Sequence, residues 1–243
     1  MRDERKPRLQ TLDRRLLLRG GASMGALAAL TGCDLSGNGP VDRALRTVSR
    51  WNDQVQAWLF DPNQLAPTYS VSDLTIPFRY NGYQPEDLAP DVDSADWRLQ
   101  VSGLVKDKTP WTVERLRTLP QEGQITRLQC VEGWSVIGQW GGAPLHTFLK
   151  AVGADTSARY VGFKCADRYY SSIDMASAMA PQTVLALDFH DKPLPSEFGF
   201  PMRLRIPTKL GFKNPKWITS LFVTNDYPGG YWEDQGYNWF SGL

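Results

Sequence analysis

Hydrophobic and polar positions recur at helical spacing in one early segment and then give way to a long polar stretch. Apolar side chains in residues 41–60 follow each other at intervals of three, four and seven positions, which predicts an amphipathic helix that ends before Pro62. We expect Trp51 and Trp58 of this helix to be packing residues. Residues 61–95 are rich in Pro, Asp, Asn and Tyr, which predicts an extended loop over a core.

Beyond residue 95, patterns typical of strands and of short helices alternate irregularly. Strands are expected at 97–101, 125–131, 160–165, 184–189, 202–206 and 217–224. Short helices are expected at 112–119, capped by Thr112, at 145–152, ending at Gly153, and at 174–180, capped by Asp174. The pattern predicts an α+β fold with a mixed β-sheet, short helices and long loops.

The N-terminus has the organisation of an export signal. Residues 1–19 are basic, with Arg14 and Arg15 adjacent, and residues 20–32 are small, apolar and uncharged before Cys33. The apolar run is shorter than the roughly 20 residues that cross a bilayer. We therefore expect a signal segment at 1–33, a tether and amphipathic helix at 34–60, and one folded domain at 61–243. The alternative is a cytoplasmic protein with an amphipathic start.

Two short motifs specify the route of export. Asp13-Arg14-Arg15-Leu16-Leu17-Leu18 is similar to a twin-arginine motif, whose pathway carries folded proteins. Leu30-Thr31-Gly32-Cys33 resembles a lipobox, which implies lipidation of Cys33, and the following Asp34 resembles a signal for retention at the inner membrane. The motifs together predict a periplasmic lipoprotein anchored to the inner membrane.

Charge and motif content narrow the class of protein. The chain has 27 basic and 26 acidic residues, and the basic excess falls within the first 33, so no nucleic-acid partner is indicated. No glycine-rich dinucleotide loop, haem-attachment motif or zinc-finger spacing occurs in the sequence. If the protein performs redox chemistry, its electrons must therefore come from or go to a separate partner.

Two cysteines remain when Cys33 is set aside. Cys130 lies at the end of an expected strand, before Gly133, a place where a fold can expose a side chain to a cleft. A thiolate there would suit a soft or high-valent metal, although a lone cysteine on a strand is more often a small core residue. A disulfide between Cys130 and Cys165 is the alternative in an oxidising compartment.

Three segments in collinear order resemble the sulfite-oxidase family of molybdopterin enzymes. Leu128-Gln129-Cys130-Val131-Glu132-Gly133-Trp134-Ser135 is similar to its molybdenum-cysteine segment, with a continuation more similar to the bacterial periplasmic branch that includes the catalytic subunit of protein-methionine-sulfoxide reductase. The segment 166–173 resembles the family's Ala-Asp-Gly-Tyr segment. The stretches 199–207 and 211–217 resemble its Gly-x-Pro-x-Arg strand and its pterin loop. The likeness runs from about residue 70 to 240.

The resemblance implies a sulfite-oxidase-like fold, a molybdopterin cofactor with molybdenum, and roles for particular residues. Cys130 would bind molybdenum, and Tyr169 would be the active-site tyrosine. The residues implied to bind the cofactor are Asn81, Cys165, Arg203, Lys213, Asn214, Pro215 and Lys216. Cys165 would line the pterin site or be simply buried, and would not be a disulfide partner.

One departure bears on the substrate. Sulfite oxidases carry an arginine just before the loop asparagine, to hold an anionic substrate, and here that place is Tyr80, with Arg79 one residue earlier. We therefore expect an oxidoreductase that transfers an oxygen atom to or from a small substrate or a sulfoxide. A membrane haem protein is the electron partner implied by the related systems. The alternatives are a sulfite dehydrogenase-like enzyme and a non-catalytic lipoprotein on the same fold.

Overall fold

The computed structural model describes residues 39–61 and 63–243, so the expected signal segment and Cys33 lie outside the described residues. The chain divides into two compact units at residues 51 and 52. Helix α2, Pro40–Leu59, runs through this division. No helix in the described part of the chain combines the length and the apolar character needed to cross a membrane.

Helix α2 confirms the predicted element but corrects the expectation for its tryptophans. Trp51 and Trp58 are 63% and 82% exposed rather than packed. Helical spacing of apolar residues reveals a stripe, but it does not specify what covers the stripe. In the second unit, Phe60 packs edge-on against Phe240 at 5.5 Å, and the Asp53 carboxylate accepts from the Phe240 backbone N–H at 2.9 Å.

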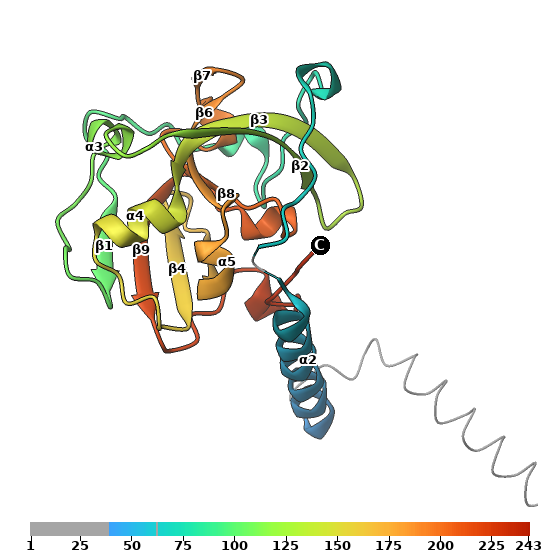
Figure 1. Ribbon diagram of the computed structural model, residues 1–243. Helices are drawn as coiled ribbons and strands as arrows, with labels where there is room; N and C mark the ends of the chain where they lie inside the picture. The colour runs from blue at the N-terminus through green and yellow to red at the C-terminus, as the bar shows by residue number, and fades with distance from the viewer. Residues whose placement is uncertain (1–38, 62) are drawn as a thin grey trace, which may run out of the picture. The chain divides into compact units, whose positions relative to one another are not determined.

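Two sheets make up the second unit (Figure 1). One has the order β1-β9-β4-β5, where β1 (Gln100–Gly103) runs parallel to β9 (Ile218–Thr224), and β4 (Tyr160–Cys165) and β5 (Tyr170–Asp174) are antiparallel. The other is antiparallel, with the order β2 (Glu122–Gln129), β3 (Ser135–Pro144), β6 (Val184–Phe189) and β7 (Lys192–Pro193), and β8 (Arg203–Arg205) also pairs with β6. The mixed sheets confirm the predicted α+β class.

The three short helices form as predicted because their caps are encoded locally. The Thr112 and Asp174 side chains accept backbone N–H groups at the starts of α3 (Val113–Arg117) and α5 (Met175–Met179). Helix α4 (Leu145–Ala151) is followed by Gly153 at φ +62°, where only glycine is unstrained. The remaining helical segments are single 3₁₀ turns: η1 (Val71–Asp73), η2 (Glu86–Leu88), η3 (Ser196–Phe198), η4 (Gly211–Lys213) and η5 (Glu233–Gln235).

Strands β3 and β5 were not predicted from the pattern. Strand β3 buries Val136, Gly138, Trp140 and Gly142 on one face, and two of these are glycines, which hide the hydrophobic alternation. Strand β5 buries Ser171 and Ser172, and its pattern is therefore polar. The strand expected at 97–101 begins only at Gln100, and the one expected at 125–131 spans Glu122–Gln129, so that Cys130 lies just past its end.

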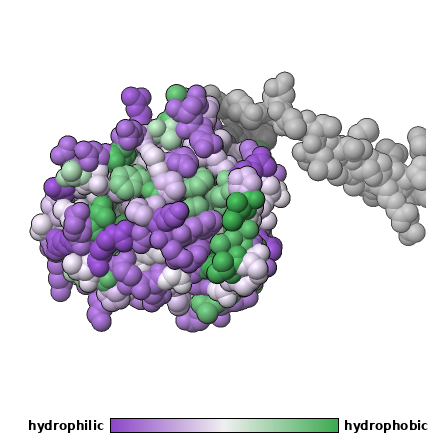
Figure 2. All heavy atoms as spheres, turned by 90° about the horizontal axis from the view of Figure 1, so that it is seen from above, coloured by the Kyte–Doolittle hydropathy of each residue, from purple (hydrophilic) through white to green (hydrophobic). Residues whose placement is uncertain are grey.

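A large hydrophobic cluster lies around the mixed sheet and helices α4 and α5, and a smaller one centres on Trp140 beneath the antiparallel sheet. Much of the face shown in Figure 2 is hydrophilic, with hydrophobic residues gathered in small patches. The smaller cluster lies beside strand β8, which carries two arginines into the interior. Strand β8 thus connects this cluster to the polar loops that form the candidate site described below.

Candidate active site

Cys130 occupies a tight turn between β2 and β3. Its backbone N–H donates to the Trp134 carbonyl at 2.9 Å, and its carbonyl accepts from Gly133, which has φ +91°. Burial raises the pKa of the half-buried Cys130 thiol, while backbone N–H groups of Glu132 and Val131 lower it. These N–H groups favour the thiolate, the form that binds a metal, but burial has the larger effect and the pKa of Cys130 is raised overall.

The Cys130 side chain lines a cavity of about 310 Å³, here called the Cys130 cavity. Five parts of the chain build it: the loop 79–85, the turn 130–134, the loop 211–216, and two pairs of residues, Asp167 with Tyr169 and Trp232 with Tyr237. The predicted site residues Asn81, Tyr169, Asn214, Pro215 and Lys216 all line this cavity with Cys130. Sequence segments more than 130 positions apart therefore meet at one place.

Gly211 allows the loop 211–216 to lie against the end of β2. A Cβ atom at Gly211 would lie 3.2 Å from the Asn81 amide nitrogen and 3.2 Å from the Gln129 carbonyl oxygen. The Asn214 side chain fixes the other end of the loop, because its oxygen accepts from Arg205 at 2.9 Å and from the Ile206 N–H at 2.8 Å. Its amide group donates to the Leu210 carbonyl at 3.0 Å, so the oxygen of Asn214 and one of its two amide N–H donors have partners within the protein.

Tyr169 has its phenol oxygen beside the same loop. The hydroxyl donates to the Phe212 carbonyl at 2.7 Å, and burial raises the pKa of this phenol well above its ordinary value. Its proton is therefore engaged by the protein, while the oxygen can still accept a hydrogen bond. Asp167, two residues earlier, accepts the Tyr169 N–H at 3.0 Å, and burial raises the pKa of its carboxyl.

Three predicted cofactor residues do not line the Cys130 cavity. Cys165 is a free thiol buried in the core behind Tyr169, and burial raises its pKa well above the ordinary value. Cys130 is also free, so the structure has no disulfide between the two. Lys213 points away and forms a buried ion pair with Glu233, whose side chain is 1% exposed. Arg203 lies beneath the loop, donating to the Phe198 carbonyl at 3.0 Å and stacking over Trp140.

Arg205 is a buried residue that the sequence reasoning did not single out. It lies on the same face of β8 as Arg203, two positions away, and both guanidinium groups lie within 6 Å of the Trp140 ring centroid. Burial lowers the pKa of each guanidinium to about 9. The alternation Arg-Leu-Arg in a short strand was the signal that could have found it. The aromatic residues at 83, 232 and 237, which also line the cavity, were missed as well.

Arg203, Arg205 and Lys216 test whether an anionic cofactor fits. Within the described residues none of the three has a carboxylate at ion-pair distance, and their acceptors are carbonyl or amide oxygens. The Nε atoms of both arginines are buried without a partner, and burial lowers the Lys216 pKa to about 6. Buried cations without anions are costly, so a phosphate-bearing cofactor fits this site.

The metal requirement fits the same cofactor. No group of three or more His, Cys, Asp or Glu side chains is arranged for a metal ion in the part of the chain that the structure describes. A metal carried by an organic cofactor needs few protein ligands, and the half-buried thiol of Cys130 can supply one.

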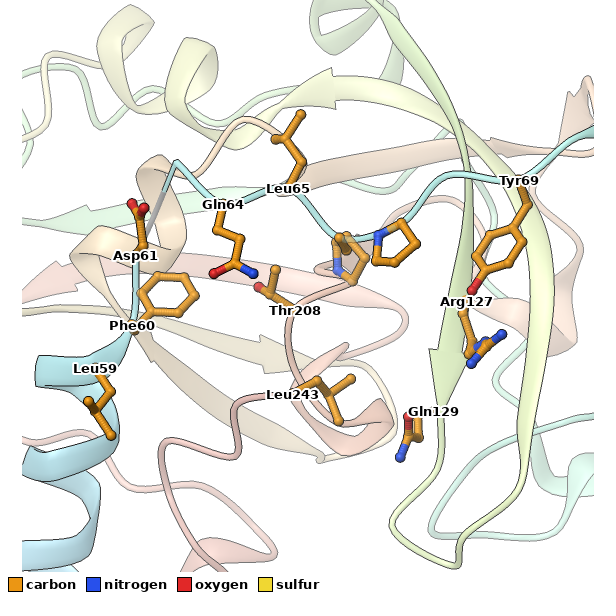
Figure 3. A pocket seen from close by; sticks show the side chains of 13 residues that line it. Leu59, Phe60, Asp61, Gln64, Leu65, Tyr69, Arg127, Gln129, Thr208 and Leu243 are labelled. Carbon is orange, nitrogen blue, oxygen red and sulfur yellow. The ribbon is translucent and has the colours of Figure 1, made fainter.

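A second cavity, of about 280 Å³, lies on the other side of the β2 end (Figure 3). Its wall includes Tyr69, Thr208 and Leu243, together with Gln129, the residue directly before Cys130. Arg127 also lines it, with its guanidinium 5.2 Å from the Tyr69 ring centroid. Gln129, the last residue of β2, and Cys130, the first residue of the turn, thus line different cavities.

Fold and site together define a class, the molybdopterin-dependent oxidoreductases with a sulfite-oxidase-like fold. The family follows from comparison with known proteins, because residues 87–232 match the family described as "Oxidoreductase molybdopterin binding domain". The chain belongs to this family. The predictions that it is an enzyme and that its cofactor is molybdopterin with molybdenum are thereby confirmed.

Relatives with descriptive names place the chain in one branch of the family. It is 58% identical to the "Putative protein-methionine-sulfoxide reductase subunit YedZ1" of Azospira oryzae, over 94% of this chain and 87% of that protein. It is 29% identical to the "Protein-methionine-sulfoxide reductase catalytic subunit MsrP" of Gluconobacter oxydans, over 93% of this chain and 74% of that protein. The resemblance to the bacterial branch that includes this reductase is confirmed.

A solved structure supports the fold. The sulfane dehydrogenase SoxCD from Paracoccus pantotrophus superposes with a TM-score of 0.54 at 22% identity, over 57% of this chain. The matched part is 40% of the length of that chain. The likeness shows the fold alone, and it confirms the predicted sulfite-oxidase-like architecture.

Proposed function

We propose that this protein reduces sulfoxides, with methionine sulfoxide in peptides and proteins as the substrate class. The names of its relatives in Azospira oryzae and Gluconobacter oxydans support this proposal. The reaction consumes two electrons and two protons, and it converts the sulfoxide into a thioether and one water molecule. A separate protein must supply the electrons.

The position of Tyr80 is the observation that carries the proposal. Tyr80 lines the Cys130 cavity where a sulfite oxidase would have an arginine, and its ring lies 3.8 Å from the Lys216 ammonium group. That ammonium group also lies 4.2 Å from the Trp217 ring and donates to the Glu197 carbonyl at 3.0 Å. The cavity therefore lacks a guanidinium fork at this position, which favours a neutral sulfoxide over sulfite.

Each side chain at the site has a role in the proposal. Bound molybdopterin supplies the two-electron chemistry of its metal. Cys130 would be the protein's ligand to that metal, and Asn81 and Lys216 would hold the cofactor. Arg203 and Arg205 would neutralise its negative charge. Asn214 and Pro215 shape the loop, and Tyr169 ties it to β5 through the Phe212 carbonyl.

A panel of substrates tests the function. The holoenzyme is assayed with reduced viologen as electron donor and N-acetyl-methionine sulfoxide or an oxidised methionine peptide as substrate. We expect viologen oxidation with both sulfoxides, and little oxidation of sulfite when ferricyanide accepts the electrons. Efficient sulfite oxidation without sulfoxide reduction would support a sulfite dehydrogenase. Purified protein without molybdenum or any turnover would indicate a non-catalytic lipoprotein.

The location is part of the same proposal. We infer that Cys33 carries lipid and holds the protein on the periplasmic face of the inner membrane, where a membrane haem protein supplies electrons. The twin arginines and the lipobox-like segment support this inference. Replacing both Arg14 and Arg15 by lysine should leave unprocessed protein in the cytoplasm. Cys33→Ala should release soluble protein or stop processing, and unchanged processing with unchanged membrane association would exclude the lipid anchor.

A further inference from the structure

One side of the Cys130 cavity is built almost entirely from aromatic rings. Tyr83, Tyr169, Trp232 and Tyr237 line it, and we call these four residues the aromatic wall. The Tyr83 and Tyr169 ring centroids are 5.5 Å apart, and those of Trp232 and Tyr237 are 5.2 Å apart. Tyr231 joins the two pairs, with its ring 4.6 Å from Tyr83 and 5.3 Å from Trp232.

The two inner tyrosines offer rings rather than hydroxyl protons. The Tyr83 hydroxyl donates to the Asp167 carbonyl, and the Tyr169 hydroxyl donates to the Phe212 carbonyl. Both phenol protons are thus engaged by the backbone. What the wall offers to a molecule in the cavity is therefore aromatic ring surface rather than hydroxyl donors.

The cations near the cavity are held on other aromatic rings. The Arg79 guanidinium lies 4.4 Å from the Trp134 ring centroid, and the Lys216 ammonium group lies 3.8 Å from that of Tyr80. The Trp134 indole N–H donates to Glu132 at 2.8 Å, so this rim also carries a carboxylate. An oxyanion placed against the aromatic wall would meet rings there rather than cations or hydroxyl donors.

We propose that the aromatic wall determines specificity by binding the S-methyl group of a methyl sulfoxide, with Trp232 and Tyr237 as the contributing residues at the rim. This inference rests on the proposed reduction of sulfoxides. The sulfur of a sulfoxide carries partial positive charge and polarises its methyl group, and both are attracted to aromatic rings. The sulfoxide oxygen is then free to turn toward the Cys130 side of the same cavity.

The segment that carries the rim is fixed in place before any substrate arrives. Trp239 donates to the Ser172 hydroxyl at 2.8 Å, and the same hydroxyl donates to the Gly229 carbonyl at 2.5 Å. Glu233, next to Trp232, is paired with Lys213 in the interior. Because the aromatic wall is already ordered, substrate binding does not have to offset the entropy cost of ordering these side chains.

Replacing Trp232 or Tyr237 by leucine removes the aromatic ring, whereas replacing either by phenylalanine keeps one. Comparing the two sets of variants shows whether the ring itself, rather than apolar volume, binds the substrate. The holoenzymes Trp232→Leu, Tyr237→Leu, Trp232→Phe and Tyr237→Phe are compared with the unchanged protein, and Tyr227→Leu is the control. Tyr227 is 57% exposed and lies outside the cavity lining. For each, KM and kcat are measured with N-acetyl-methionine sulfoxide, and its Kd is measured by calorimetry.

We expect each leucine variant to raise KM and Kd about three- to tenfold, with kcat changed less than twofold. The phenylalanine variants should recover most of the affinity, and Tyr227→Leu should resemble the unchanged protein. Equal Kd values in the unchanged and leucine variants would overturn the proposal, and so would phenylalanine variants as weak as the leucine ones. If Kd depends on the rings but neither the variants nor the unchanged protein turn over the sulfoxide, the proposed function is refuted and the proposed binding site is retained. No measurable binding by the unchanged protein would refute the wall as a sulfoxide site.

Discussion

Lys213 and Lys216 look alike in the sequence, but their surroundings predict opposite effects of losing the charge. The Lys213 and Glu233 side chains are 0% and 1% exposed and form an ion pair, whereas no carboxylate lies at ion-pair distance from Lys216 among the described residues. Lys213→Met leaves the Glu233 carboxylate buried without a cation. Breaking a buried pair in this way costs about 3–5 kcal/mol. For a domain of this size that lowers the midpoint of thermal unfolding by roughly 6–20 °C.

Lys216→Met removes a buried amino group that has no carboxylate at ion-pair distance among the described residues. We expect it to be neutral or stabilising in the cofactor-free protein, and to reduce the molybdopterin retained by the holoenzyme. Lys213→Met should mainly lose stability, and Glu233→Leu combined with it should restore most of that loss. The assay measures urea unfolding curves and pterin content of the unchanged protein, the two single lysine variants and the Lys213→Met/Glu233→Leu double variant. Equal destabilisation by Lys213→Met and Lys216→Met, or no recovery in the double variant, would refute the reasoning.

Three further predictions concern the thiols, one pKa and one helix cap. Cys130→Ser should fold but lose the sulfur-to-metal absorption band and nearly all activity, whereas Cys165→Ser should keep both; equal destabilisation of the two without any change in a metal signal would contradict this. Burial lowers the Lys216 pKa from 10.5 to about 6, so the unfolded chain binds the proton more tightly and stability rises with pH from about 6 toward 10. Lys216→Met should reduce that slope by up to about 1.4 kcal/mol per pH unit in unfolding curves of the cofactor-free protein, and an unchanged slope would count against it. Thr112→Ala removes the side-chain acceptor for the Arg115 N–H at 3.1 Å and should lower the free energy of unfolding by about 1 kcal/mol, with Thr118→Ala, just past the helix, as the comparison.

The sequence indicated the elements whose signals are local. The caps at Thr112 and Asp174 and the glycine after α4 were predicted because each depends on a few adjacent residues. Strand β3 was missed because half of its inward positions in the first eight residues are glycines that pack against distant strands. Their burial is determined by tertiary contacts, which leave no periodic trace in the sequence.

The candidate site shows the same division. Cys130, Asn81 and Lys216 were found through resemblance, and the structure brings them to one cavity. That resemblance does not distinguish a lysine that faces a cofactor from one that pairs with Glu233, because the partner lies 20 positions away in a segment without a motif. Trp232 and Tyr237 were missed for a related reason, since ordinary aromatic residues at the surface carry no signal of the cavity they line.

The residues that line the Cys130 cavity are spread along most of the chain, and this determines when the cofactor can be inserted. The Cys130 cavity draws on residues from Arg79 to Tyr237, so no early part of the chain can form it alone. Insertion of molybdopterin must therefore wait until the ribosome has made residue 237 and the two sheets have closed. Under the proposed export, and with the cofactor available only in the cytoplasm, the protein would have to cross the membrane folded and loaded, and a pathway that translocates unfolded chains would deliver an enzyme without its cofactor.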